Sequence, residues 1–371
     1  MTAWADRIAA RNDAIRSSGR WRSVRPLDTG TAATTLSATG APVVSFASND
    51  YLGLSQHEAP VAVARHALMT YGAGAGAARL IVGARPVHER LEDELAEWCD
   101  REAALLFSTG YQANLGVLGA LAGCAANTVI YSDELNHASI IDGCRLSRAE
   151  VVVYRHRELE HLSELLAARA GRPSIVVTDS VFSMDGDLAP LDGLAALCAD
   201  VGALLVVDEA HAVLADPPPP GAVVVGTLSK TLGSVGGFVA ADAEVVDLCR
   251  NVARSFIFTT AGAPADAAAA LAALRVLRSD EGAALVARLR ANVEALVPGA
   301  PSPILPIVLG SEERAVSVAA ALLDRGLLVP AIRPPTVAPG TCRLRVAVSA
   351  VHTPEQLDLL RDALDELEVT W

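Results

Sequence analysis

Lys230 is the residue whose surroundings most strongly suggest chemistry. It follows the apolar run AVVVGT (222–227) and lies in TLSKTLG (227–233), where small and glycine residues surround it. A lysine at the end of a buried strand loses hydration, which lowers its pKa and makes the amine able to form a Schiff base. A lysine that extends to the surface or pairs with a carboxylate is the alternative.

Two polar residues follow a second apolar run, ALLVVD (203–208). Asp208 ends this run and could pair with a pyridinium nitrogen. At about 3 Å and an effective dielectric constant near 20, such a pair gains on the order of 5 kcal/mol before desolvation. That energy is enough to keep the ring of pyridoxal phosphate protonated, the state in which it withdraws electrons. His211 could reach the phenolic oxygen of the same ring. A helix cap or a metal ligand is the alternative for Asp208.

A third segment, FSTGYQANLG (107–116), has the pattern of a strand, a tight turn and the start of a helix. Gly110 would let the backbone approach a ligand closely. The amides of Gly110 and Tyr111 would then point at a phosphate near the helix N-terminus. Thr227 could donate its hydroxyl to the same phosphate, and an ordinary turn is the alternative.

Further residues lie where a bound ring or a substrate could contact them. His137 follows one apolar run and could stack on a cofactor ring, and Ser183 follows another. Arg345 lies between apolar residues in CRLRVAVS (342–349), where a buried guanidinium favours a planar carboxylate such as that of an amino acid. A structural histidine and a solvated arginine are the alternatives. The scattered histidines lack the spacing of a metal site.

These residues follow short apolar runs that alternate with helical patterns. Several runs are apolar throughout, which is typical of strands buried on both faces of a mainly parallel sheet. Ligands bind such open α/β sheets at the carboxyl ends of the strands, so the polar residues there are expected to converge. The runs predicted as strands are 43–48, 103–108, 128–132, 151–155, 174–179, 203–208, 222–227 and 236–241. The predicted helices between them are 86–99, 111–122, 157–170 and 191–201.

The same patterns divide the chain into three parts. Residues 1–42 are predicted to hold an amphipathic helix at 3–17 and a linker. Residues 43–262 would form the large cofactor-binding domain. Residues 263–371 show long helical patterns followed by mixed strands and helices, which predicts a smaller α+β domain.

Composition argues against several classes of partner. The 371 residues carry a formal net charge of −13, which disfavours nucleic acid and anionic membrane surfaces. The six cysteines form no C-x-x-C pair, and the charged N-terminal segment lacks the apolar stretch of a signal peptide. No segment has the uncharged apolar length that spans a bilayer. We therefore expect a cytoplasmic protein.

Five motifs occur in an order that is known from one enzyme family. They are SFASNDYLGL (45–54), SVFSMDGDLAPL (180–191), VVDEAHA (206–212), TLSKTLG (227–233) and IRPPTVAPGTCRLR (332–345). Together they resemble the α-oxoamine synthases, homodimeric pyridoxal-phosphate enzymes of fold type I that condense an amino acid with an acyl thioester and release CO2. The resemblance implies an aminotransferase-like α/β fold, in which a mainly parallel sheet is flanked by helices and a smaller α+β domain follows.

The resemblance also implies a role for each matching residue. Lys230 resembles the Schiff-base lysine, Asp208 the pyridinium partner and His137 a ring-stacking histidine that also faces the substrate. Further cofactor contacts would come from Gly110, Tyr111, Ser183, His211 and Thr227, and from Thr259 and Thr260 of the neighbouring subunit. The amino-acid carboxylate would be held by Asn49 and Arg345, and the acyl substrate by Arg22 and Thr336.

The segment 332–345 is similar to the family members that condense L-alanine with pimeloyl-CoA or pimeloyl-acyl-carrier protein in biotin biosynthesis. Family members that use glycine or serine, such as the 2-amino-3-ketobutyrate and 5-aminolevulinate enzymes, are alternatives, and a non-catalytic pyridoxal-phosphate binder is another. The chain departs from the family after DEAH. There AVLADPPPP (212–220) replaces a glycine-rich stretch and shortens the connection to the lysine strand.

Overall fold

The structure is a computed structural model and describes residues 3–371. Its strands are β1 Ala33–Leu36, β2 Ala41–Ser45, β3 Ala103–Phe107, β4 Val129–Asp133, β5 Glu150–Tyr154, β6 Ser174–Asp179, β7 Leu204–Asp208, β8 Val223–Thr227, β9 Gly237–Ala241, β10 Ile304–Gly310, β11 Leu327–Leu328, β12 Ala331–Ile332 and β13 Cys342–Ala347. Its α-helices are α1 Ala3–Ser17, α2 Glu58–Tyr71, α3 Pro86–Trp98, α4 Gly110–Ala122, α5 Ala138–Ser147, α6 Leu159–Ala167, α7 Leu191–Val201, α8 Ala243–Val252, α9 Arg254–Ile257, α10 Pro264–Leu277, α11 Asp280–Leu296, α12 Glu312–Asp324 and α13 Pro354–Glu366.

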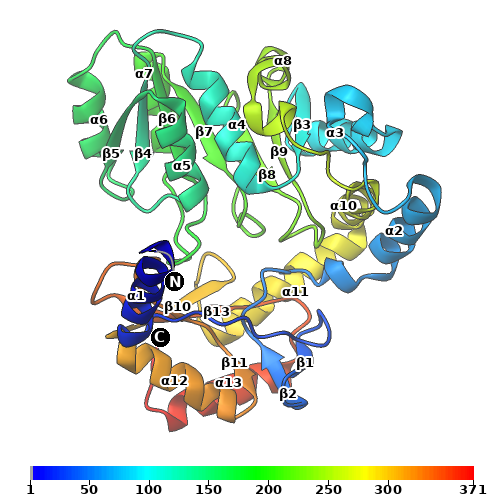
Figure 1. The fold of residues 1–371 in the computed structure, drawn as a ribbon, viewed down its shortest axis with the longest axis vertical. Coiled ribbons are helices and arrows are strands. Elements are labelled where there is room, and N and C mark those ends of the chain that lie inside the picture. The colour runs from blue at the N-terminus through cyan, green and yellow to red at the C-terminus, as the bar shows by residue number, and fades with distance from the viewer. Residues whose placement is uncertain (1–2) are drawn as a thin grey trace.

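These elements form an upper and a lower body, which α10 and α11 connect (Figure 1). The upper body holds a seven-stranded sheet in the order β3-β9-β8-β7-β6-β4-β5, with helices packed against it. The lower body holds two three-stranded sheets, β1-β2-β11 and β10-β13-β12, together with α12 and α13. Strands that are distant in the sequence therefore meet in each sheet.

The large sheet is mainly parallel, as the unbroken apolar runs predict. Strands β5, β4, β6, β7 and β8 pair in parallel, while β9 pairs antiparallel with both β8 and β3. The register pairs Asp179 at the end of β6 with Asp208 at the end of β7. The polar residues that follow these strands therefore lie along one edge of the sheet.

Alternating side chains of each strand enter the hydrophobic clusters on the two faces of this sheet. On β3, Leu105 packs in the cluster that contains Val117 of α4. Its neighbour Leu106 packs in the cluster that contains Leu274 of α10. Burial on both faces explains why the runs lack polar alternation.

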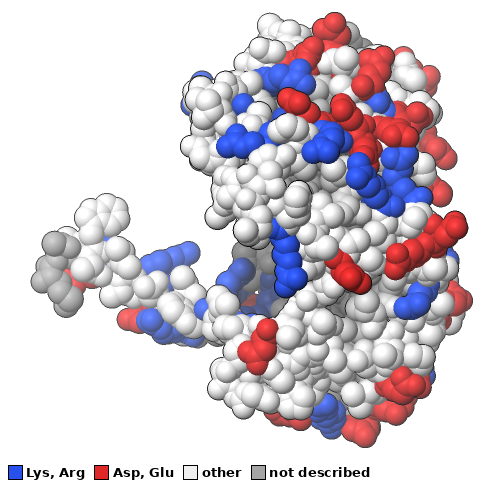
Figure 2. Space-filling model, turned by 90° about the vertical axis from the view of Figure 1, so that its right-hand side faces the viewer, with Lys and Arg blue, Asp and Glu red and all other residues white. Residues whose placement is uncertain are grey.

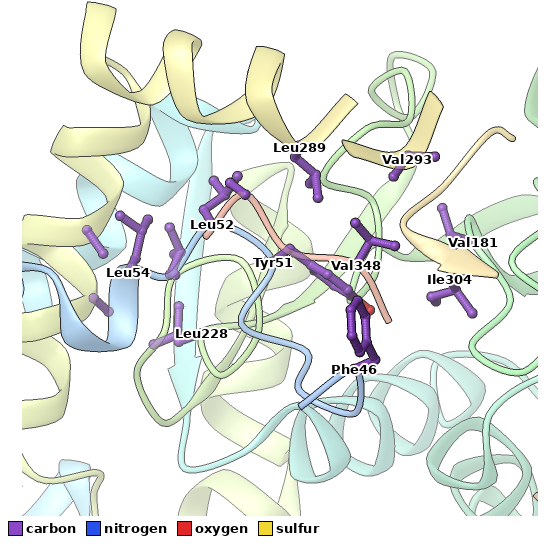
Figure 3. Close-up of a cluster of buried hydrophobic side chains, with 14 of the residues drawn as sticks. Phe46, Tyr51, Leu52, Leu54, Val181, Leu228, Leu289, Val293, Ile304 and Val348 are labelled. Carbon is purple, nitrogen blue, oxygen red and sulfur yellow. The ribbon is translucent and has the colours of Figure 1, made fainter. Parts of the chain in front are cut away.

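The segment after β2 packs against residues of both bodies. Figure 3 shows Phe46 and Tyr51 pointing into a buried cluster beside Val348, which follows β13. Leu228, which precedes the lysine of the upper body, belongs to the same cluster. The loop that carries Lys230 is thus packed against residues of the lower body.

One sequence expectation about these elements is wrong, and some helices were not predicted. The run 43–48 was predicted as a strand of the large sheet, but β2 pairs with β1 and β11 in the lower body. A short apolar run specifies an extended backbone without specifying its partner strand. The helices α2, α5 and α8 were not predicted, while the four helices predicted between 86 and 201 are confirmed within a few residues.

The N-terminal helix α1 forms where it is predicted and buries none of its residues. Trp4 is 68% exposed and Ile8 is 57% exposed. Figure 2 shows this segment projecting from the rest of the chain as an arm. Trp4 and Ile8 therefore keep most of their surface exposed within residues 3–371. Among residues 3–371, no helix is long and apolar enough to cross a bilayer. The domain limits at 42 and 262 stay a prediction.

Candidate active site

Lys230 is buried at the carboxyl edge of the large sheet, in the turn that follows β8. Its Nζ lies 2.7 Å from Nε2 of His211, and no carboxylate of residues 3–371 forms an ion pair with it. Burial lowers the pKa of this amine to about 8, although Asp208 and Asp179 act in the opposite direction. Lys230 is also the single lysine of the 371-residue sequence. The structure therefore presents one amine that is partly neutral near physiological pH.

A chain of hydrogen bonds leads away from this amine. The Nδ1 atom of His211 lies 2.6 Å from the hydroxyl of Tyr51, which in turn donates to Oδ1 of Asn49 at 3.3 Å. Burial lowers the pKa of His211 and raises that of Tyr51 to about 12, so both groups are neutral at pH 7. Because the ammonium of Lys230 donates to Nε2, the histidine proton is placed on Nδ1.

Asp208 is held on the side of the sheet that faces α4. Its Oδ2 accepts a hydrogen bond from Nδ2 of Asn114 at 2.6 Å, and its Oδ1 accepts one from the amide of Ala210 at 2.9 Å. Asn114 Nδ2 lies 2.9 Å from the hydroxyl of Ser139, which lies 2.7 Å from Nδ1 of His137. The structure thereby brings Asp208 and His137 into one network around Asn114, which the sequence did not reveal.

Asp179 is a second residue that the sequence reasoning missed. Its Oδ2 accepts a hydrogen bond from the amide of His137 at 2.8 Å. Burial raises its pKa well above the ordinary range, and the nearby charge of Asp208 adds to this shift. Asp179 ends β6 just as Asp208 ends β7, and that shared position was the signal that could have identified it.

The turn between β3 and α4 has the shape that anion binding requires. Thr109 caps α4 by accepting the amide proton of Gln112, and Gly110 is the first residue of the helix. A Cβ atom at Gly110 would lie 3.2 Å from Cβ of Thr227, so a larger residue would crowd this position. Ser108 donates to the carbonyl of Thr260 at 3.0 Å, which draws the Thr259–Thr260 segment of the same chain toward this turn. Tyr111, the next residue of α4, donates its hydroxyl to Asp142.

Arg345 lies on β13 of the lower body, and 5% of it is exposed. Its guanidinium donates to Oδ1 of Asn49 at 3.1 Å and to the carbonyl of Ser183. Among the described residues no carboxylate forms an ion pair with it, whereas its neighbour Arg343 pairs with Asp185. A buried and uncompensated guanidinium is suited to binding a carboxylate.

Two predicted site residues do not join this cluster. Arg22 lies exposed on the segment that follows α1, and Thr336 lies exposed on the loop between β12 and β13. Within the described part of the chain, neither side chain forms a hydrogen bond to Lys230, His211 or Asp208. Their contacts with an acyl substrate stay a prediction.

His156 supports the loop that carries Ser183. Its Nδ1 lies 2.9 Å from Asp133 and its Nε2 lies 2.9 Å from Asp187, and its ring meets Phe182 edge-on. Burial lowers the pKa of His156, but the two carboxylates outweigh burial and raise the pKa to about 9. The histidine therefore stays protonated at pH 7. It joins the ends of β4 and β5 to the loop that carries Ser183 and Asp187.

This ion pair predicts a pH dependence of stability. Because the pKa in the folded state exceeds the ordinary value of about 6.5, the stabilisation is complete below about pH 6.5 and is lost as the pH rises through about 9. We expect His156→Gln to lower the Tm by a few degrees at about pH 7 and by much less near pH 10. Thermal melts across this range check the prediction, with the exposed His66→Gln in α2 as control. A Tm difference that does not change with pH would contradict it.

The arrangement fits pyridoxal 5'-phosphate in each of its parts. The amides and hydroxyls at Gly110 and Thr227 suit the phosphate, and the carboxylate of Asp208 suits the ring nitrogen. His137 belongs to the same network, because its Nδ1 hydrogen bonds to Ser139 beside Asn114. Within the described part of the chain, Asn114 Oδ1 is buried without a hydrogen-bond partner, so this network keeps one unused acceptor. The amine of Lys230 lies close enough to Asp208 and Asp179 for both carboxylates to act on its pKa.

Known proteins are similar to this chain both in sequence and in fold. Residues 41–364 match the family model of aminotransferase class I and II. An 8-amino-7-oxononanoate synthase of Anaeromyxobacter dehalogenans is 48% identical and aligns with 95% of this chain and 93% of its own length. The enzyme of the same name from Alkalilimnicola ehrlichii is 46% identical, with 95% of each chain covered.

Solved structures agree with this assignment. The serine palmitoyltransferase of Sphingomonas wittichii matches with a TM-score of 0.88 and 30% identity, over 99% of this chain and 98% of its own. An 8-amino-7-oxononanoate synthase of Francisella tularensis matches with a TM-score of 0.73 and 27% identity, over 88% and 98%. The predicted fold type I architecture and the resemblance to the α-oxoamine synthases are confirmed. The chain therefore belongs to the aminotransferase class I and II family and, within it, to the 8-amino-7-oxononanoate synthases.

Proposed function

We propose that this protein condenses L-alanine with a pimeloyl thioester and releases CO2 and the free thiol, which yields 8-amino-7-oxononanoate for biotin biosynthesis. The observation that carries the proposal is the buried amine of Lys230, which hydrogen bonds to His211 rather than to a carboxylate. Relatives with 46–48% identity over nearly the whole chain support the choice of reaction within the family.

Different residues of the cluster would bind different parts of the cofactor. Bound pyridoxal phosphate would supply an electron sink that stabilises negative charge at the α-carbon of the amino acid. Asp208 is positioned to keep the ring nitrogen protonated. Gly110, Tyr111 and Thr227 would hold the phosphate, Thr259 and Thr260 of a second copy would add to them, and Ser183 and His211 would contact the ring oxygen.

Lys230 is the group that moves the substrate proton. A pKa of about 8 leaves part of the amine neutral near pH 7, so it can take a proton from the α-carbon of alanine and return one later. His211 orients this amine through its Nε2 and is itself fixed by Tyr51. His137 would stack on the ring and donate to the oxyanion that develops on the thioester carbonyl.

Arg345→Lys is expected to raise the KM for L-alanine about 10- to 100-fold and to change kcat much less. Hydrogen bonds to charged groups contribute roughly 1.5–3 kcal/mol, and an ammonium cannot reproduce the paired geometry of a guanidinium. Initial rates at varied alanine concentration give both constants. Arg325→Lys, at the exposed residue that follows α12, serves as the control. An unchanged KM for alanine would remove Arg345 from the carboxylate site.

Product analysis tests the proposed reaction itself. Purified holoenzyme would be incubated with pimeloyl-CoA or pimeloyl-acyl-carrier protein, together with alanine, glycine or serine in parallel. We expect the mass of 8-amino-7-oxononanoate with alanine and little product with the other two amino acids. Preferred turnover of glycine or serine would assign the chain to a different α-oxoamine synthase activity, and the two thioesters identify the carrier.

We also propose that the active site is completed by a second copy of this chain, in the cytoplasm. Leu80 is 50% exposed, Ile81 74% and Val82 68%, and Phe258, next to Thr259, is 70% exposed. A homodimer would cover these apolar side chains and bring Thr259 and Thr260 to the neighbouring phosphate site. Sedimentation velocity at micromolar concentration is the direct measurement, and a monomer that retains full turnover would contradict the proposal.

A further inference from the structure

A cavity of about 400 Å³ lies on the opposite side of β7 from the Asp208 network. Its walls come from the C-terminal ends of α3 and α10, from β8 and β9, and from the short proline-rich connection 212–220. The volume falls within the range of about 300–1,000 Å³ that small-molecule sites occupy. No residue of this wall takes part in the reaction proposed above.

Glu209 is the acidic residue in the wall of this cavity. Its amide donates to the carbonyl of Val225 at 2.7 Å, so the strand pairing continues one residue beyond Asp208. Successive side chains of an extended strand point to opposite faces. Asp208 therefore reaches Asn114 on one face, whereas Glu209 lines the cavity on the other.

One carboxylate oxygen of Glu209, Oε1, is buried and accepts no hydrogen bond from any of residues 3–371. The nearby guanidinium of Arg101 donates to backbone carbonyls of the connection and of its own turn, namely those of Pro218, Pro219, Ala222, Cys99 and Asp100. Arg278, at the cavity wall, pairs with Glu97 at 2.6 Å. Both neighbouring cations are thus already engaged, and Glu209 keeps an unused buried acceptor in the wall of the cavity.

Apart from Thr231 and Arg278, the rest of the wall is mostly apolar and partly aromatic. Trp98 and Phe238 meet with ring centroids 6.4 Å apart and planes tilted by 53°. Val213, Pro217 and Leu277 complete the apolar surface. Aromatic faces attract organic cations, and a carboxylate accepts a charge-assisted hydrogen bond from a protonated amine. One carboxylate among aromatic rings is a poor site for a metal ion, which prefers several oxygen ligands.

We propose that this cavity is a second ligand site, which binds a small organic ammonium ion with an apolar body. The ammonium N–H donates to Oε1 of Glu209, and the apolar part packs between Trp98, Phe238 and the proline connection. The site is separate from that of the amino-acid substrate. Its ligand would nevertheless touch Thr231, the residue that follows Lys230.

The test is titration of the holoenzyme with N,N-dimethylbenzylammonium by calorimetry. This tertiary amine carries one N–H donor and cannot form an imine with the cofactor, so active-site chemistry does not interfere. We expect saturable binding that L-alanine does not displace, and weaker binding of the uncharged isostere isobutylbenzene. Glu209→Gln should weaken the affinity about 10- to 100-fold, as loss of a hydrogen bond between charged groups predicts. Trp98→Leu should weaken it a few-fold.

Asp216→Asn is the matched control, because it removes an exposed carboxylate of the same connection that is outside the cavity wall. It should bind the amine as the wild type does. Ala215→Phe fills the cavity without changing any charge and should abolish binding of the amine. This variant tests the site independently if Glu209→Gln does not fold. Absence of saturable binding to the wild type, displacement by alanine, or equal affinity in Ala215→Phe would each overturn the proposal.

Discussion

Lys230→Ala is expected to reduce turnover by about three orders of magnitude or more and to abolish covalent attachment of the cofactor. The reason is that this amine both holds the cofactor and moves the substrate proton, and positioned acid–base groups alone contribute roughly 10²–10⁴-fold. Steady-state turnover and intact mass after borohydride reduction measure the two effects. Because the sequence contains no other lysine, Lys230 is the one side-chain amine that this reduction can label, and a mass increase that is lost in Lys230→Ala reports position 230.

Two controls make this result specific. Lys230→Arg keeps a cation beside His211 but cannot form the covalent link, so it should lose activity as fully as the alanine variant. Both variants should retain the thermal stability of the wild type within a few degrees. A Lys230→Ala protein that turns over at near wild-type rate would remove Lys230 from the reaction.

Asp208→Asn is expected to lower kcat about 10³-fold with little change in the KM for alanine. The ionic pair with the ring nitrogen gains on the order of 5 kcal/mol at an effective dielectric constant near 20, and each 1.4 kcal/mol corresponds to about tenfold in rate. Asparagine keeps the size of the side chain and an acceptor for Asn114, so the charge is the main change. Steady-state kinetics with alanine as the varied substrate separates kcat from KM.

The exposed Asp200→Asn at the end of α7 removes one negative charge without touching the site and should leave kcat unchanged. Asp179→Asn is the more informative comparison, because Asp179 lies beside Asp208 and hydrogen bonds to the amide of His137. We expect a smaller loss of kcat from Asp179→Asn than from Asp208→Asn. Equal losses would indicate that the two carboxylates act as one unit.

The strand-end residues could be predicted from the sequence because a parallel sheet collects the carboxyl ends of its strands at one edge. Asp208, His211 and Lys230 each follow an apolar run. In the structure Lys230 hydrogen bonds to His211, and the charge of Asp208 is close enough to raise the pKa of the lysine. Local sequence also predicted the turn at Gly110, where the small residue faces Thr227. The assignment of individual roles came from the resemblance rather than from these patterns.

Only the tertiary structure showed how the rest of the site is assembled. Asn114 lies within a largely apolar helix, and the face on which it meets Asp208 depends on how α4 packs against the sheet. Tyr51 reaches His211 because β2 belongs to the lower body, contrary to the sequence prediction.

The sequence by itself determined which segments are extended or helical and which polar residues end them, because these depend on neighbouring residues along the chain. The packing of those segments decided which of the polar residues meet. The contact of Lys230 with His211 joins residues 19 positions apart, and that of Arg345 with Asn49 joins residues 296 positions apart. The cavity beside Glu209 is likewise lined by several separate elements of the fold. Their geometry follows from burial of the apolar faces, and no local pattern encodes it.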